Sequence, residues 1–218
     1  MRKIFLSLIL TFITLFIFAQ EVKIDSVAFI IEHDDIILYL DCDTNSFITV
    51  HKLEKNDLYY LTGKRYNKWY KEYPYGPYKL KYYVKTGYDL GHLTPSHITS
   101  YSDSVNIYSF SLFNQAPQLA SFNRGKWSKL EKKVENDLKL INENATIITG
   151  VIYNNNNKMY LNGSRIKIPL MYYKIVVTKT TVNCYIGSNI NGDLITTDLK
   201  TILEIARKNK NSLDIIIK

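Results

Sequence analysis

The sequence predicts an α+β domain with a largely antiparallel or mixed sheet. Strand-rich runs occur both before and after a single clear helical segment, without the regular strand–helix alternation of a parallel sheet. The 218 residues contain no linker and no internal repeat. Hydrophobic residues make up 46% of the chain, which supplies a core and excludes a disordered polar chain. We therefore expect one compact domain over residues 21–218.

The first strand-rich segments lie in the N-terminal half. Residues 27–40 predict a strand, a turn at residues 34–35 and a second strand, and residues 46–53 predict a third. Residues 59–88 hold ten of the 18 tyrosines, interleaved with lysines, and are broken into loops by proline and glycine at residues 74–77. Such a stretch either stacks bases and holds a phosphate backbone, or packs its tyrosines at the core edge with its lysines solvated.

One segment has a clear helical period. Apolar residues recur at spacings of three and four through residues 124–141, which predicts an amphipathic helix. These residues are Trp127, Leu130, Val134, Leu138 and Ile141. After this helix the sequence predicts a buried strand at 145–153, a hairpin turn at 154–157, strands at 166–177 and 181–187, and a last amphipathic helix at 196–207.

The first twenty residues have the layout of a secretory signal peptide. Arg2 and Lys3 precede an apolar run over residues 4–18, and Ala19 and Gln20 lead into a polar stretch. The alternative is a single membrane anchor, but the run is shorter than the ~20 residues that span a bilayer. We expect cleavage after Ala19 or Gln20, which predicts a secreted or periplasmic protein without stable membrane association.

Charge and cysteine content narrow the possible partners. The formal net charge of +8 indicates an anionic partner, although a lysine-rich surface alone gives a similar excess. The two cysteines, Cys42 and Cys184, are too few for a disulfide framework or a four-cysteine zinc site. In an oxidising compartment they either pair with each other or remain two buried thiols.

A histidine, an amide and a carboxylate stand out in the middle of the chain. His92 lies between two strand-rich runs and directly follows Gly91, a residue suited to a turn or a close approach. A lone histidine is more often structural than catalytic. With Asn123 and Glu131 downstream, however, an imidazole can take a proton from water while oxygen ligands hold a hard divalent ion such as Mg²⁺. No cysteine or histidine spacing supports a zinc site.

Three motifs in this region resemble the DNA/RNA non-specific endonuclease family. They are residues 89–92 (DLGH), 114–118 (NQAPQ) and 123–131 (NRGKWSKLE), in the order and spacing of that family. These enzymes are ββα-metal nucleases, a group that includes mitochondrial endonuclease G. The resemblance covers roughly residues 58–180 and implies a ββα-metal nuclease fold, with a central mostly antiparallel sheet flanked by helices.

The resemblance also implies roles for individual residues. His92 would be the general base that activates water, and Asn123 would be the direct protein ligand of one Mg²⁺, with Mn²⁺ as the alternative ion. Glu131 would hold metal-bound waters, and Asn114 would support the catalytic site. Eight residues of straight helix span about 12 Å, so either Asn123 lies in a loop that curls back or Glu131 acts only through waters. Without the motif, Glu131 would be a solvated helix carboxylate paired with a neighbouring lysine.

Substrate contacts are expected from Arg65, Asp89, Arg124 and Lys85. The chain departs from the family at Leu90, where the family has an arginine, and Arg124 or Lys85 could supply the missing charge. We therefore predict an exported, Mg²⁺-dependent endonuclease that cuts DNA and RNA with little sequence specificity. The alternative is a catalytically weak or inactive protein on the same fold that binds nucleic acid or another partner. The sequence does not predict an oligomeric state.

Overall fold

A computed structural model describes residues 16–17, 20–23, 29–41, 45–69, 80–211 and 213–217. Most of the predicted signal peptide and Cys42 lie outside the described residues. Cys184 is a buried free thiol. None of the helices in the described ranges is long and apolar enough to cross a bilayer.

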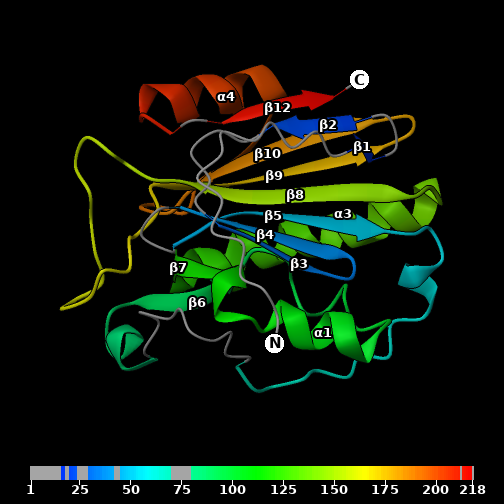
Figure 1. Ribbon diagram of the computed structural model, residues 1–218, viewed down its shortest axis with the longest axis horizontal. Coiled ribbons are helices and arrows are strands. Elements are labelled where there is room, and N and C mark those ends of the chain that lie inside the picture. The colour runs from blue at the N-terminus through cyan, green and yellow to red at the C-terminus, as the bar shows by residue number, and fades with distance from the viewer. Residues whose placement is uncertain are drawn as a thin grey trace, which may run out of the picture.

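The centre of the fold is a seven-stranded sheet in which every pair of neighbouring strands is antiparallel (Figure 1). Its strand order is β11-β10-β9-β8-β5-β4-β3. The bounds are β3 (Phe29–His33), β4 (Ile36–Leu40), β5 (Ser46–Leu53), β8 (Ala145–Ile152), β9 (Met171–Thr178), β10 (Val182–Ser188) and β11 (Leu194–Thr197). The predicted α+β class with a mostly antiparallel sheet is confirmed.

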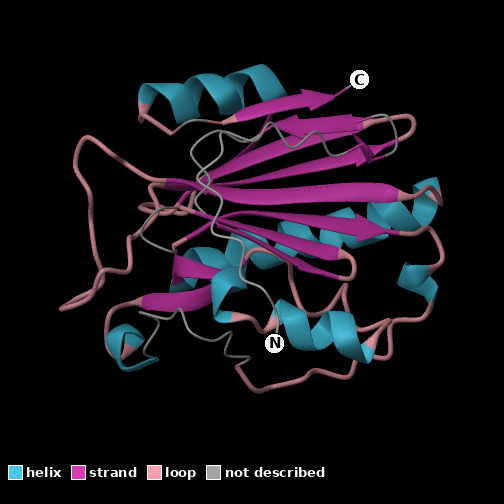
Figure 2. Cartoon of the chain, in the orientation of Figure 1, coloured by secondary structure: helices cyan, strands magenta, loops and turns pink. Residues whose placement is uncertain are grey.

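The remaining elements surround this sheet (Figure 2). A small sheet joins β1 (Phe16–Ile17), β2 (Gln20–Lys23) and β12 (Asp214–Ile217), and a separate ribbon joins β6 (Tyr88–His92) and β7 (Gln115–Leu119). The helices are α1 (Asp103–Ser109), α2 (Ala120–Phe122), α3 (Ser128–Ile141) and α4 (Leu199–Lys208), with a π-helical turn η4 (Asn123–Trp127) between α2 and α3. Short 3₁₀ turns are η1 (Asp57–Tyr59), η2 (Leu80–Tyr83) and η3 (Leu112–Asn114).

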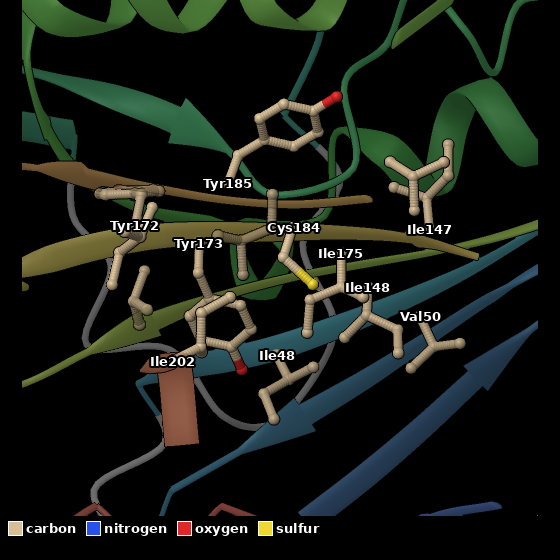
Figure 3. Close-up of a cluster of buried hydrophobic side chains, with 14 of the residues drawn as sticks. Ile48, Val50, Ile147, Ile148, Tyr172, Tyr173, Ile175, Cys184, Tyr185 and Ile202 are labelled. Atoms are coloured by element: carbon tan, nitrogen blue, oxygen red, sulfur yellow. The ribbon is translucent and has the colours of Figure 1, made fainter. Parts of the chain in front are cut away.

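The two faces of the central sheet bury different side chains. Val50, Ile148, Ile175 and Cys184 are consecutive register partners and lie on the face that contains Ile202 of α4, which we call the α4 face (Figure 3). The next residue of each strand points to the opposite side, because side chains alternate along a strand. That opposite side, which we call the α3 face, is covered by the apolar side of α3.

Most predicted elements have their predicted position. The strand, turn and strand of residues 27–40, the strand of 46–53, the helix of 124–141 and the strands of 145–153 and 181–187 are confirmed within a few residues. The buried positions predicted in the helix are confirmed for Trp127, Leu130, Val134 and Leu138. The antiparallel pairing of β8 with β9 also bears out a hairpin, although residues 153–170 form a long connection in place of a tight turn.

Two predictions need correction, and one helix was missed. Residues 166–170 do not belong to β9, and Pro169 among them has no amide to donate to a sheet. The last helix begins at Leu199 and not at 196, because the Asp198 side chain caps it by accepting a hydrogen bond from the Thr201 amide at 2.7 Å. Helix α1 was not predicted, because its seven residues are too few for a periodic pattern.

Candidate active site

The β6–β7 ribbon holds two of the three motifs and is fixed firmly to the central sheet. Asp89 pairs with Gln118 and His92 with Gln115 across the ribbon. Asn189, just after β10, donates to the Pro117 carbonyl oxygen at 2.9 Å and accepts from the Leu119 amide at 2.7 Å. This buried amide therefore ties β7 to the sheet.

Two glycines allow the close packing that places the site. A Cβ atom on Gly91 would lie 2.4 Å from Oε1 of Gln118, so only glycine fits at position 91 of this motif. A Cβ atom on Gly187 of β10 would lie 2.4 Å from the Phe122 ring. Gly187 therefore lets α2 approach the sheet and brings Asn123, the next residue after α2, up to the ribbon.

Asn123 begins the π-helical turn that connects α2 to α3. Gly125 within this turn has φ −107° and ψ −106°, which lie outside the helical region. A π turn of this kind is often found at functional sites. Asn123 thus lies in a helical turn with a local kink, and not in the loop that was one of the two alternatives left open by the sequence.

Asp89 joins Asn123 and Arg124 into one polar group. Its Oδ2 atom accepts from Asn123 Nδ2 at 2.9 Å and from Arg124 Nε at 2.9 Å, and its Oδ1 accepts from Arg124 Nη2 at 2.6 Å. Partial burial opposes ionisation of Asp89, but the hydrogen bonds from Arg124 and Asn123 outweigh it and lower its pKa. Asp89 therefore orients two neighbours, and its contact with substrate stays a prediction.

His92 lies at the other end of β6 in an aromatic surrounding. Its ring centroid is 5.2 Å from that of Phe110 in an edge contact and 5.8 Å from that of Trp69. Among the described residues its Nε2 atom is buried and has no hydrogen-bond partner. Burial lowers the pKa of His92 to about 3, and the positive charge of Arg65 acts in the same direction. The imidazole is therefore neutral at pH 7, as a proton acceptor must be.

Arg65 is held near this histidine, and its predicted contact with phosphate stays a prediction. Its guanidinium carbon lies 4.9 Å from the Phe110 ring centroid, and its Nη1 donates to Ser96 Oγ at 2.9 Å. These two contacts fix a cation near the unpartnered nitrogen of His92. Lys85, in contrast, is exposed in the turn before β6, and within the described residues it makes no hydrogen bond or ion pair with the site.

Asn114 supports the site through the backbone. Its side chain is fully buried, accepts from the Thr94 amide at 2.9 Å and donates to the carbonyl oxygens of Thr94 and Ser109 at 2.8 and 2.7 Å. The two bonds to Thr94 fix the turn that follows His92, and the third ties this turn to the end of α1 at Ser109. Asn114 thus acts by holding the chain in place, with its amide directed away from solvent.

Glu131 lies on the inner side of α3, near a lysine that the sequence did not single out. Burial raises the pKa of Glu131 to about 7, while Lys174 of β9 and the Trp127 indole oppose this rise. The neighbouring lysines have other partners, since Lys132 pairs with Glu135 and Lys133 with Asp137. Glu131 is therefore not the solvated, lysine-paired carboxylate of the alternative interpretation. The only sequence signal for Lys174 is one cation within the apolar run of residues 168–177.

Leu90 has become part of the core. Its half-buried side chain packs against the cluster that contains Tyr83, Leu112 and Phe113. The cation beside this strand is Arg124, which Asp89 holds by two parallel hydrogen bonds. Arg124 is thus the better placed of the two predicted substitutes for the family arginine.

The oxygen donors at this site suit a hydrated magnesium ion. Because Asn123 donates its Nδ2 to Asp89, its Oδ1 is left as an acceptor. Within the described part of the chain there is no group of three or more His, Cys, Asp and Glu side chains that could hold a metal. Mg²⁺ commonly binds proteins through one or two oxygen ligands and keeps several waters. Asn123 fits the direct ligand of such an ion.

Comparison with known proteins places the chain in a family. A family model described as DNA/RNA non-specific endonuclease matches residues 18–211. A chain of the crystal structure of the EndoG/EndoGI complex superposes with a TM-score of 0.67 at 19% sequence identity, over 82% of this chain and 83% of that one. No curated protein matches. Because the match spans most of the sequence, and the fold agrees, the chain belongs to the DNA/RNA non-specific endonuclease family.

Proposed function

We propose that the protein is an exported, Mg²⁺-dependent endonuclease that hydrolyses phosphodiester bonds of DNA and RNA with little sequence specificity. The observation that carries this proposal is the neutral His92 imidazole, whose buried Nε2 has no hydrogen-bond partner among the described residues and lies near Arg65. A nitrogen that holds no other hydrogen bond within the described residues can accept a proton from water, and the cation beside it suits attack on a phosphate.

Each residue has a distinct part in this reaction. His92 Nε2 takes a proton from water, and the resulting hydroxide attacks phosphorus. The opposite phosphorus–oxygen ester bond breaks, and the leaving oxygen takes up a proton from water. Arg65 and Arg124 stabilise negative charge on the phosphate oxygens. Asn123 Oδ1 would hold Mg²⁺, or Mn²⁺ in its place, and Glu131 would accept hydrogen bonds from water around the ion. When bound, the ion supplies positive charge that favours the transition state and the leaving oxygen.

The second candidate is a catalytically weak or inactive protein that binds nucleic acid on the same fold. Leu90 favours it, because this strand lacks the family arginine and its leucine is packed into the core. The presence of His92, Asn123 and Glu131 together favours the enzyme.

The deciding test is cleavage of plasmid DNA and of RNA by the purified protein with Mg²⁺, Mn²⁺ or EDTA. We expect cleavage of both substrates with the metal and none with EDTA. His92→Ala should lower the rate by ~10²–10⁴, the usual cost of losing a general base, while nucleic-acid binding is retained. Asn123→Ala should also lose activity, through weaker metal binding. Binding without cleavage by the wild type would favour the second candidate.

The proposed export is tested separately. Strand β2 begins at Gln20, so cleavage after Ala19 would leave this strand whole and paired with β12. Protein recovered from the native host should begin at Gln20 or Glu21 by N-terminal sequencing or intact mass. An intact Met1 in the membrane fraction would contradict cleavage and favour an anchor.

A further inference from the structure

Lys174 is a cation buried in the interior of the domain. It lies near the middle of β9 with only 1% of its surface exposed. Burying an ammonium group is costly unless hydrogen bonds and opposite charge offset the lost hydration. Its Nζ donates to Thr149 Oγ1 at 2.6 Å. One hydroxyl group is a small compensation, so the position calls for a functional explanation.

The lysine is part of a row of polar side chains on the α3 face. Thr49, Thr149 and Lys174 are consecutive register partners across β5, β8 and β9. Thr94 Oγ1 lies 3.1 Å from Thr49 Oγ1, and the Thr94 amide donates to Asn114 Oδ1 at 2.9 Å. The row thus runs from beneath α3 to the turn that follows His92.

Above the row, Lys174 faces the helix that carries Glu131. Its Nζ lies 5.2 Å from the centroid of the Trp127 ring. Trp127 and Glu131 are four residues apart and share one side of the helix, since such residues are neighbours on an α-helix. Burial lowers the pKa of Lys174 to about 8 and raises the pKa of Glu131 to about 7, and the attraction between the two charges opposes both shifts.

We propose that Lys174 is a positioning residue of the active site: its ammonium group, fixed by Thr149 beneath Trp127, is the countercharge that orients the Glu131 carboxylate for holding metal-bound water. The inference rests on the proposed function, because it gives Lys174 a task only through Glu131. A purely structural role does not explain the choice of lysine, since a buried charge is often replaced by an apolar side chain of similar volume without loss of stability.

The test is Lys174→Met, which removes the charge and keeps an unbranched side chain. Loss of a residue that orients a metal-site group typically costs 10–100-fold in metal affinity or activity. We expect a loss of at least about tenfold in Mn²⁺ affinity, measured by electron paramagnetic resonance on the protein without substrate, and a similar fall in kcat with little change in KM for DNA. Unchanged Mn²⁺ affinity and kcat in a folded Lys174→Met variant would overturn the proposal.

A double-mutant cycle shows whether Lys174 acts through Glu131. If it does, Lys174→Met combined with Glu131→Gln should bind Mn²⁺ no more weakly than Glu131→Gln alone, whereas additive losses would contradict it. Thr149→Val removes the hydroxyl that holds Nζ, and we expect a smaller loss in the same direction, with Thr149→Ser as the matched control. These two variants carry the test if Lys174→Met fails to fold; equal behaviour of Val and Ser at 149 would then count against the proposal.

The Mn²⁺ measurement also separates this inference from the proposed function. A wild type that binds Mn²⁺ but cleaves no nucleic acid would refute the proposed enzyme. The effect of Lys174→Met on Mn²⁺ binding would still be measured in that case.

Discussion

The two faces of the central sheet are built from alternating residues of the same strands, yet they differ in chemistry. On the α4 face, Val50, Ile148 and Ile175 pack as consecutive apolar partners (Figure 3). Next to these residues on each strand, Thr49, Thr149 and Lys174 form a polar row on the α3 face. The consecutive partners on the α4 face are apolar and stabilise the fold through burial. On the α3 face, polar side chains stand at the matching positions, where we propose that they support the site. We therefore expect substitutions at neighbouring residues of one strand to affect either the free energy of unfolding or the activity.

The largest effect on stability is expected at Ile148. Its side chain is buried in the α4 face, so Ile148→Ala removes apolar contact and leaves a cavity, at a cost of about 2–5 kcal/mol in the free energy of unfolding. Urea denaturation followed by circular dichroism measures this loss. Because Ile148 points to the face opposite the polar row, we expect kcat per folded molecule to stay at the wild-type value. A fall in kcat that exceeds the unfolded fraction would mean that the two faces are coupled.

The next effect concerns Arg124, which the ribbon holds next to Asn123. Arg124→Ala should lower kcat by ~10²–10³, the usual cost of one preorganised group that stabilises transition-state charge, with little change in melting temperature because the side chain is largely exposed. Steady-state cleavage at one fixed salt concentration is the measurement, since phosphate binding depends strongly on salt.

Lys85→Ala is the matched control for Arg124→Ala. Lys85 is an exposed cation near the same strand, and we expect it to keep nearly wild-type kcat. Leu90→Arg should fail to raise kcat and should lower stability, because it places a charge in the cluster around Phe113. If Leu90→Arg raised kcat while Arg124→Ala had no effect, Arg124 would not be the substitute for the family arginine.

The smallest expected effect is a dependence of stability on pH that comes from the α3 face. His51 of β5 is buried, and burial followed by the charge of Lys174 lowers its pKa to about 3. Below pH 6.5 the unfolded chain binds a proton that the folded protein does not, so stability is lost as pH falls from 6.5 toward 3. The expected slope from this residue is about 1.4 kcal/mol per pH unit.

His51→Phe keeps a ring stacked on Tyr101 and removes the titrating group. Urea denaturation of this variant and of the wild type at pH 7, 6 and 5 should therefore give a shallower acid dependence for the variant. Equal slopes would show that His51 does not resist protonation in the folded protein. The apolar α4 face offers no corresponding histidine among its register partners Val50, Ile148 and Ile175.

Local patterns predicted the elements better than they predicted contacts between them. The helix over residues 128–141 was predictable because its apolar residues repeat at three and four, and the strands of the sheet because they are apolar runs bounded by turns. The extent of β9 was predicted wrongly, since residues 166–170 are apolar except for Lys167 but belong to a connection. Composition alone does not distinguish such a connection from a strand.

In the candidate site, too, the positions of residues in the chain were predicted better than their contacts. The sequence placed Glu131 correctly on a helix and Asn123 just before it, whereas His92 was expected after a strand and is the last residue of β6. The orienting role of Asp89 was not predictable, because it depends on how the ribbon packs against the π turn. Lys174 was missed for a similar reason. Its contacts come from Thr149, 25 residues earlier, and from Trp127, which is still more distant in sequence. The family resemblance, and not residue spacing, supplied the roles.

The π-helical turn limits how this segment can change in length during evolution. Asn123–Trp127 is anchored at both ends, by the bond from Asn123 to Asp89 and by the burial of Trp127 against the sheet. Each residue of a helix rotates the chain by about 100°. Deleting one residue between these anchors would therefore turn Asn123 away from Asp89 or Trp127 out of the core. Substitutions at exposed positions such as Lys126 are compatible with this geometry, whereas insertions and deletions between the two anchors should be absent from active relatives.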